Sequence, residues 1–484
     1  MLVSAATLIV SFPTFAGDYL TNTNQNAAFL RMIARGASID VDGVYSNPAG
    51  LTFLPKDGFY LSLTGQSAYQ TRDIRSTTPL WATDENNTRL YEGKASAPII
   101  PSFHGVYKNG DWAISTAFSI NGGGGKASFD SGLPMFDAKI TGMINEMTQG
   151  MLTPDKYTIN SAMEGRQYIY GLQLGLTYKI NDYLSVFAGG RMNYFTGGYK
   201  GFLNVQLKNG VQEQLASAMG QILVQKYMQN GLPQDQALIE AQKKVEEAGN
   251  KLAKANIELD CDQSGWGLTP IIGIDAKLGR WNLAAKYEFR TNMNIENKNY
   301  KPEPELEEAQ SVMAPYAHGV NTPSDIPAML SVAAQYAILP SLRASVEYHF
   351  FDDKRAGMAN VTLPDGTSIA KEKTLSRGTH EYLAGVEWDL DQRITVSGGF
   401  QKTSYGLTDN FQTDTSFYCS SYSLGFGARV HLHPQWSIDV AYFWTTYSDY
   451  TKSSDNYYGL ANIKGTNVYS RSNKVFGLSL NYNF

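Results

Sequence analysis

From about residue 58 to the C-terminus, apolar and polar residues alternate with the period of two that is typical of β-strands. The final segment shows this most clearly, because Phe476, Leu478 and Leu480 are separated by single small or polar residues. Apolar faces recur along the whole chain, and the opposite faces carry charged residues such as Glu288 and Arg343. This pattern predicts an all-β transmembrane barrel, with apolar side chains outside and a polar interior.

The alternation predicts about 14 antiparallel strands, an even number, as expected when both ends of a single-chain barrel lie on the same side. They cover about residues 58–69, 98–108, 112–120, 167–180, 183–199, 264–278, 281–294, 327–337, 341–352, 380–390, 393–403, 421–431, 436–449 and 474–484. Tight turns alternate with long segments, at about 121–165, 208–260, 295–325, 353–378, 404–418 and 451–473. Short turns at one end and long loops at the other are typical of outer-membrane barrels.

Two of the long loops, 121–165 and 208–260, contain apolar residues at helical spacing and are predicted to be helical and extracellular. The apolar residues considered for ligand capture are Ile140, Met143, Ile144, Met147, Leu215, Met219, Ile222 and Leu223. Two interpretations remain open. The helices either pack on one another, or they form an apolar groove that captures a ligand, for which the flexible Met side chains are suited.

Composition removes several other classes of protein. The chain has 484 residues, 43% hydrophobic and 18% charged, which excludes a disordered protein. The net charge of −5 argues against nucleic-acid binding. No run of about 20 apolar residues follows the first segment, and a membrane-spanning helix would need one.

Residues 1–16 are predicted to be a signal peptide, because an apolar segment ends in the small-residue sequence Thr14-Phe15-Ala16. The usual basic residues are missing before it, so we expect the natural start to lie upstream of Met1. A short buried strand or helix is the alternative. Export would also fit the presence of only two cysteines, Cys261 and Cys419, whose pairing the sequence leaves open.

Residues 17–57 do not alternate, and we expect them to fill the lumen, because a barrel of this width cannot be filled by its own side chains. Residues 26–35 are predicted to be a short helix. Asn47, Pro48, Ala49 and Gly50 are predicted to form a turn, with Pro48 fixing φ and Gly50 permitting a left-handed conformation. This turn is either a rigid joint of the plug or simply the start of the first strand.

Here the sequence resembles the FadL family of outer-membrane transporters for long-chain fatty acids and other hydrophobic compounds. The resemblance is carried by Arg35-Gly36-Ala37-Ser38 followed by Val44-Tyr45-Ser46-Asn47-Pro48-Ala49-Gly50-Leu51, which is similar to the family's hatch signature. It continues through Gly265-Trp266-Gly267, residues 327–350 and the terminal Phe484. It covers nearly the whole mature chain, densely in the hatch and thinly in the loops.

The resemblance implies a 14-stranded barrel, residues 58–484, that is plugged by an N-terminal hatch, residues 17–57, in a Gram-negative outer membrane. It implies import in three steps, namely capture on extracellular loops, rearrangement of the hatch, and lateral release at a kinked third strand. Asn47, Pro48 and Ala49 carry over as hatch residues, whereas the pocket residues do not. The implied partners are a hydrophobic small molecule, outer-membrane lipid and lipopolysaccharide, and the barrel-assembly machinery, with the protein a monomer.

Alternative functions are an importer of aromatic hydrocarbons, a surface receptor or adhesin, including one that binds haem, and a lipid hydrolase. We expect no catalytic residues, metal or cofactor. Gly122-Gly123-Gly124-Gly125 lacks the Lys-Ser/Thr of a phosphate-binding loop and is interpreted as a flexible loop or as a hinge beside the third strand. His431 and His433 are interpreted as turn residues, with a metal or haem contact as the alternative, and Asp40 and Asp42 lack the further ligands of a calcium loop.

Overall fold

The computed structural model describes residue 23 and residues 25–148, 150, 152–253, 256–302, 310, 313–363 and 366–484. The predicted signal peptide, residues 1–16, lies outside the described residues.

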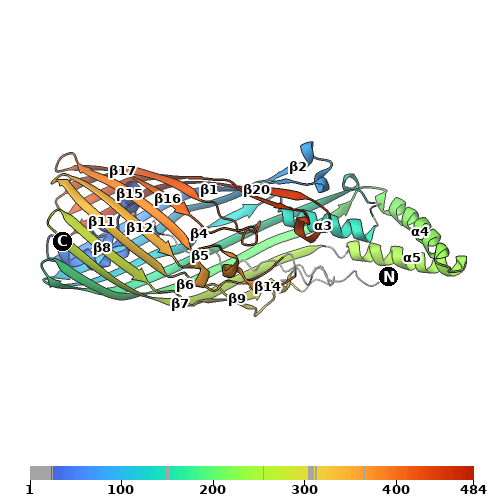
Figure 1. Ribbon diagram of the computed structural model, residues 1–484, viewed down its shortest axis with the longest axis horizontal. Coiled ribbons are helices and arrows are strands. Elements are labelled where there is room, and N and C mark those ends of the chain that lie inside the picture. The colour runs from blue at the N-terminus through green and yellow to red at the C-terminus, as the bar shows by residue number, and fades with distance from the viewer. Residues whose placement is uncertain are drawn as a thin grey trace.

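A closed barrel of 14 antiparallel strands forms the body of the molecule (Figure 1), which confirms the predicted fold. The barrel strands, in order around the wall, are β1 (Gly58–Thr77), β3 (Gly93–Asn109), β4 (Trp112–Phe129), β5 (Tyr157–Asn181), β6 (Leu184–Leu207), β7 (Ile257–Leu278), β8 (Trp281–Glu288), β11 (Met329–Leu339), β12 (Leu342–Phe351), β15 (Thr379–Asp389), β16 (Ile394–Ser404), β17 (Ser421–His433), β18 (Trp436–Tyr447) and β20 (Gly465–Asn483). Pairing of β1 with β20, from Tyr60 opposite Asn483 to Thr77 opposite Thr466, closes the wall.

Shorter strands and helices lie in the loops and in the segment before β1. The short strands are β2 (Thr88–Tyr91), β9 (Asn294–Asn299), β10 (Asn321–Pro323), β13 (Asn360–Thr362), β14 (Ser368–Ala370) and β19 (Tyr450–Ser454). The helices are α1 (Ala27–Met32), α2 (Gly43–Ser46), α3 (Pro134–Met147), α4 (Val211–Gln229) and α5 (Gln234–Ala253). The 3-10 helices are η1 (Pro48–Phe53), η2 (Pro79–Trp81), η3 (Glu85–Asn87), η4 (Pro154–Lys156), η5 (Ala314–Tyr316), η6 (Asp353–Arg355), η7 (Lys371–Thr374) and η8 (Tyr457–Gly459).

The wall has apolar side chains outside and polar ones inside. On β1, Leu63 is 60% exposed on the outer surface, whereas its neighbour Thr64 is 2% exposed and faces the interior. The terminal strand repeats this, with Leu478 exposed and Ser479 buried. Since a soluble protein would bury such leucines, the outer surface is suited to hydrocarbon.

Several strands are longer than the alternation predicted. β4 continues to Phe129 and β5 begins at Tyr157, so the loop predicted at 121–165 is reduced to residues 130–156. The extensions lie towards the loop end of the barrel, where the outer face no longer needs to be apolar, so the alternation that identifies a strand is lost.

The predicted strand 281–294 is interrupted, because β8 ends at Glu288 and β9 begins at Asn294. Phe289 donates a backbone hydrogen bond to Pro270 on β7. Pro270 has no N–H to return that bond, so the ladder breaks at this point.

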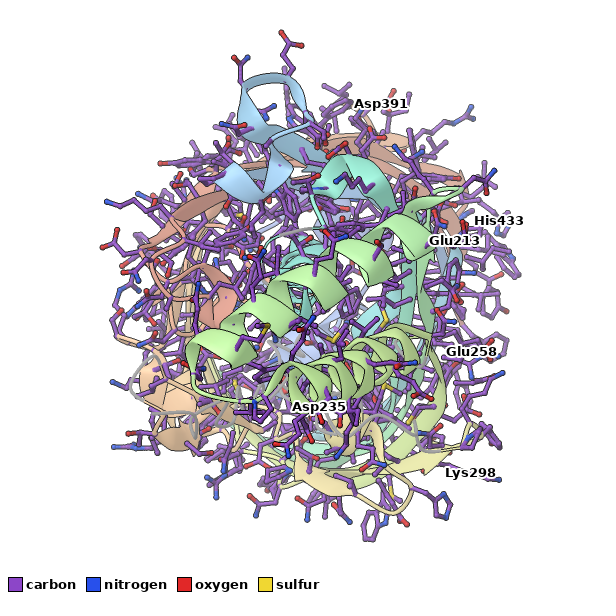
Figure 2. All side chains as sticks on the ribbon, turned by 90° about the vertical axis from the view of Figure 1, so that its right-hand side faces the viewer. Glu213, Asp235, Glu258, Lys298, Asp391 and His433 are labelled. Atoms are coloured by element: carbon purple, nitrogen blue, oxygen red, sulfur yellow. The ribbon has the colours of Figure 1, made fainter. Side chains whose placement is uncertain are left out.

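The two ends of the barrel differ, as predicted. Short turns and the C-terminus lie at one end, and α3, α4 and α5 lie at the other (Figure 1). Figure 2 looks along the barrel from the helical end, with Glu213 labelled near the start of α4 and Asp235 near the start of α5. Among the described residues, no helix has both the length and the apolar character needed to cross a membrane.

The N-terminal residues 25–57, which we call the hatch, are packed inside the barrel. α1 contacts β15, β16, β17, β18 and β20, whereas η1 contacts strands from β3 to β8 on the other side. Phe29, Leu30 and Ile33 belong to a buried cluster with Phe443 and Val475 of the wall. The hatch therefore occupies the lumen and contacts most of its circumference.

Candidate functional site

The Asn47-Pro48-Ala49-Gly50 motif is attached to the wall by polar contacts from three strands. Asn47 Nδ2 donates to Asp275 Oδ2 of β7 at 2.6 Å. Thr177 of β5 donates to the Pro48 carbonyl at 2.8 Å, and Ser185 of β6 donates to the Ala49 carbonyl at 2.5 Å. The motif thus has its backbone carbonyls satisfied by barrel side chains, as buried carbonyls require.

Gly50 is required for the close packing of the hatch against the wall, and not for the left-handed backbone conformation that was predicted. Its φ is not positive, so the predicted left-handed turn is wrong. A Cβ at this position would lie 2.6 Å from Asn47 Nδ2 and 3.3 Å from Asp275 Oδ2. Glycine therefore permits the close approach of the hatch turn to the wall.

The other half of the hatch is attached by buried ion pairs. Arg31 of α1 contacts Glu387 of β15 at 2.5 Å and Asp439 of β18 at 2.8 Å. Asp40 contacts Arg429 of β17 at 2.6 Å. Burial raises the pKa of Asp40, but the charges of Arg429 and Arg35 outweigh burial and hold that pKa below its ordinary value.

A cavity of about 330 Å³ lies in the lumen next to the hatch, a size ordinary for small-molecule sites. Thr23 and Phe29 of the N-terminal segment line it, and so do Ile100, Phe443 and Val475 of the wall. The lining also includes polar residues, among them Gln401, Thr403, Tyr418, Tyr447, Glu381, Arg72 and Arg471. The cavity therefore offers apolar surface and hydrogen-bond donors together.

Two of the polar lining residues are arginines on neighbouring strands. Arg72 of β1 and Arg471 of β20 are directly opposite each other in the strand register. Arg471 makes only long hydrogen bonds, 3.5 Å to the Phe417 carbonyl and 3.4 Å to Gln70 Oε1, and its buried Nε has no partner among the described residues. Two guanidinium groups in this arrangement are suited to receive an anion such as a carboxylate.

The wall beside this cavity contains a break in strand pairing. β3 and β4 pair at residues 93–96 with 126–129 and at 103–109 with 112–118, but among the described residues no Cα pair joins 97–102 to 119–125. We call this the pairing break. Ala97 and Ile100 on one side, and Gly123 and Gly125 on the other, line the cavity.

The sequence on both sides accounts for the pairing break. Pro98 and Pro101 on β3 have no N–H to give to a ladder. Gly122–Gly125, interpreted above as a loop or a hinge, lie within β4, so the loop interpretation is wrong. β4 is the third barrel strand, and its register against β5 shifts twice in this stretch, with Gly123 at φ +66°. Glycine-bearing bulges of this kind bend a strand.

A second, narrow pocket of about 70 Å³ lies under α3. It is almost wholly apolar, and its lining residues include Phe136, Ile140, Met163, Leu203 and Tyr316. Lys139 is the basic residue in this lining, and burial lowers its pKa to about 7, against an opposite effect of Asp414.

The residues predicted for ligand capture fall into two clusters. Ile140 and Ile144 pack with Leu152, Tyr157 and Leu203, and Met143 packs against this group. Met219 and Leu223 pack instead against Ala241 of α5, within the α4–α5 hairpin, and Ile222 is exposed. The backbone at Met147 and Leu215 is helical, and their side chains lie outside what the structure describes. The structure thus groups the α3 residues apart from those of α4.

The cysteines and histidines considered above do not line the cavity. Cys261 and Cys419 are both buried and both unpaired. His431 and His433 lie at the end of β17. Within the described ranges, no group of three or more His, Cys, Asp or Glu residues could hold a metal ion. The lining of the cavity was missed from the sequence. The resemblance implied a kink in the third strand, and Pro98, Pro101 and the glycine run mark the pairing break beside that strand.

No protein-family model and no curated protein matches the sequence. Among solved structures, the chain is similar to a Pseudomonas aeruginosa FadL homologue, with a TM-score of 0.63 at 16% identity over 97% of this chain and 100% of that one. It is also similar to the Pseudomonas putida toluene transporter TodX, with a TM-score of 0.54 at 14% identity over 96% of this chain and 100% of that one. The FadL-type fold predicted from the hatch motif is confirmed.

Proposed function

We propose that the protein imports hydrophobic molecules across the outer membrane of a Gram-negative bacterium, with long-chain fatty acids as its main ligands. Capture takes place on the extracellular loops, the ligand enters the cavity beside the hatch, and the hatch rearranges. The ligand then leaves sideways through the pairing break into the bilayer.

The observation that carries this proposal is the contact between the cavity and the pairing break. A fatty acid that entered the periplasm through the lumen would have to cross the polar, ion-paired side of the hatch. A path through the wall leads instead from a partly apolar cavity, lined by Ile100 and Gly123, towards hydrocarbon. Each buried methylene group is worth about 0.8 kcal/mol, which favours the lateral path for a long chain.

Arg72 and Arg471 favour a ligand with a carboxylate. Their guanidinium groups line the cavity, and the buried Nε of Arg471 has no acceptor among the described residues. A carboxylate would supply an acceptor to the Nε of Arg471 and add a negative charge beside Arg72, whereas a hydrocarbon would do neither. Charge-assisted hydrogen bonds of this kind contribute about 1.5–3 kcal/mol.

Capture involves the apolar pocket under α3, to which Ile140 contributes. This narrows the predicted groove to its α3 side, with Ile140, Met143 and Ile144. In this account residues 17–57 act as the hatch and residues 58–484 as the barrel. The Asn47–Gly50 motif is the rigid segment that attaches the hatch to the barrel wall. The protein acts as a monomeric transporter rather than an enzyme, among lipid and lipopolysaccharide, after insertion by the barrel-assembly machinery.

Uptake of radiolabelled oleate by cells that lack their own transporter tests this function. Cells that make the protein should accumulate oleate, and Arg471→Gln should lower apparent affinity by about tenfold or more while the barrel stays folded. Arg72→Gln should act in the same direction. No uptake by the folded wild-type protein would contradict the proposal.

Import of aromatic hydrocarbons is the second candidate. It is favoured by the apolar lining of the α3 pocket and by the likeness to the toluene transporter TodX. Toluene uptake that exceeds oleate uptake and is unaffected by Arg471→Gln would favour it. Haem or a host protein bound to the purified material would favour a surface receptor instead.

A further inference from the structure

The pairing break is bridged by the first described turn of the hatch. Gln25 Nε2 donates a hydrogen bond of 3.1 Å to the Ile120 carbonyl of β4. Ser102 Oγ of β3 donates a hydrogen bond of 2.5 Å to the carbonyl of the same Gln25. One hatch residue therefore joins the two strands where they do not pair with each other.

These two hydrogen bonds of Gln25 are buried and lie where β3 and β4 make no backbone pairing. Gln25 is 4% exposed and Ser102 is 2% exposed. Ile120 has a paired residue on β5, Tyr170, but none on β3. Gln25 gives the Ile120 carbonyl a donor on a strand that β3 leaves unpaired here, and a wall carbonyl without a donor is costly in a membrane.

The same bridge is connected to the cavity. Thr23 and Phe29, on either side of Gln25 in the chain, both line the cavity. Asn26, the next residue, caps α1 through a 2.8 Å hydrogen bond from the Ala28 N–H and also donates to Ser62 of β1 at 3.1 Å. A ligand in the cavity would therefore contact Thr23 and Phe29, the lining residues that flank Gln25 in the chain.

We propose that Gln25 is a positioning residue that keeps the pairing break closed, so that movement of the hatch and lateral opening of the wall are a single event. This inference rests on the proposed function. When the hatch rearranges, Gln25 withdraws from Ser102 and Ile120 together, and β3 and β4 become free to separate between residues 97–102 and 119–125.

The test measures release of bound radiolabelled oleate from the full-length protein into liposomes. Gln25→Glu preserves the size of the side chain but cannot donate to the Ile120 carbonyl, and Ser102→Ala removes the second bond. Each substitution should speed release by about two- to tenfold, which is the change in rate expected when one hydrogen bond that holds the break closed is lost. Ser46→Ala is the matched control, because Ser46 bonds within the hatch, to the Asp42 carbonyl.

A second experiment distinguishes opening of the pairing break from a general loss of rigidity in the protein. A Cβ at position 125 would lie 3.6 Å from the Ala97 Cβ, which is within the range of a disulfide. Ala97→Cys with Gly125→Cys, in a Cys261→Ser, Cys419→Ser background, should return the release rate of Gln25→Glu to a slow value when oxidised. Unchanged release in both Gln25→Glu and Ser102→Ala, or fast release that the disulfide does not slow, would overturn the inference. A wild-type protein that releases no oleate into liposomes would instead contradict the proposed function.

Discussion

Asn47 of the hatch donates its side-chain amide to Asp275 of β7 at 2.6 Å, and Asn282 of β8 donates to the same carboxylate oxygen at 2.8 Å. The carboxylate is fully buried, so each donor offsets part of its desolvation. Asn47 of the hatch motif is thus needed to satisfy the buried carboxylate of Asp275. Loss of this hydrogen bond should destabilise both the hatch turn and the buried carboxylate in the wall.

Asn47→Ala should therefore loosen the hatch turn without unfolding the barrel. A lost hydrogen bond to a buried charged group costs about 1.5–3 kcal/mol. Hydrogen exchange should become faster in residues 43–53 and stay unchanged in β12 and β15. Equal acceleration in those strands would mean that the motif stabilises the whole barrel.

Pro48→Gly tests the rigidity of the same turn. Pro48 begins η1 and accepts a hydrogen bond from Thr177 through its carbonyl, which glycine retains. The substitution therefore changes chain flexibility, at a cost of about 0.4–1 kcal/mol, and leaves the contact available. Oleate uptake should fall while the protein remains resistant to heat in detergent; normal uptake would show that the turn serves only to start β1.

The ion-paired side of the hatch should respond to acid. The pKa of Asp40 is lower in the folded protein than the usual value of about 3.9, so its contribution to stability is complete above that pH. The contribution is lost as the pH falls from about 3.9 through the lowered pKa. Exchange of residues 31–42 should rise in that range and not between about pH 5 and 7, and Asp40→Asn should reduce the dependence, since Glu387 and Asp439 also pair with Arg31.

Lys139 should make capture of a carboxylated ligand depend on pH. Its pKa of about 7 means that the ammonium form predominates below neutrality and the neutral amine above it. Oleate binding should be tighter at about pH 6 than at about pH 8.5, and Lys139→Met should flatten this difference. Binding that is equally pH-dependent in Lys139→Met would exclude Lys139 as the cause.

The α4–α5 hairpin should be dispensable for folding. Met219, Leu223 and Ala241 form its own small core, and the hairpin projects beyond the barrel (Figure 1). Deletion of residues 211–256 with a short linker should leave the thermal stability of the barrel unchanged. An unfolded product would show that the helices support the wall.

The alternation identified the wall because each strand faces two different environments, as Leu63 and Thr64 show. The turn predicted at Asn47–Gly50 is instead the cap and the first residues of the 3-10 helix η1. The contacts that make the site could not be predicted, because they join residues far apart in sequence, such as Gln25 with Ser102 and Asn47 with Asp275. The glycine run was misinterpreted because an isolated Gly-rich stretch does not reveal whether a neighbouring strand pairs with it.

The most direct test of lateral release uses the Ala97→Cys, Gly125→Cys disulfide alone, with the hatch unaltered. When oxidised, the protein should still bind oleate but transfer it to the bilayer at least tenfold more slowly, and reduction should restore transfer. Equal transfer by the oxidised and reduced forms would mean that the ligand does not pass between β3 and β4.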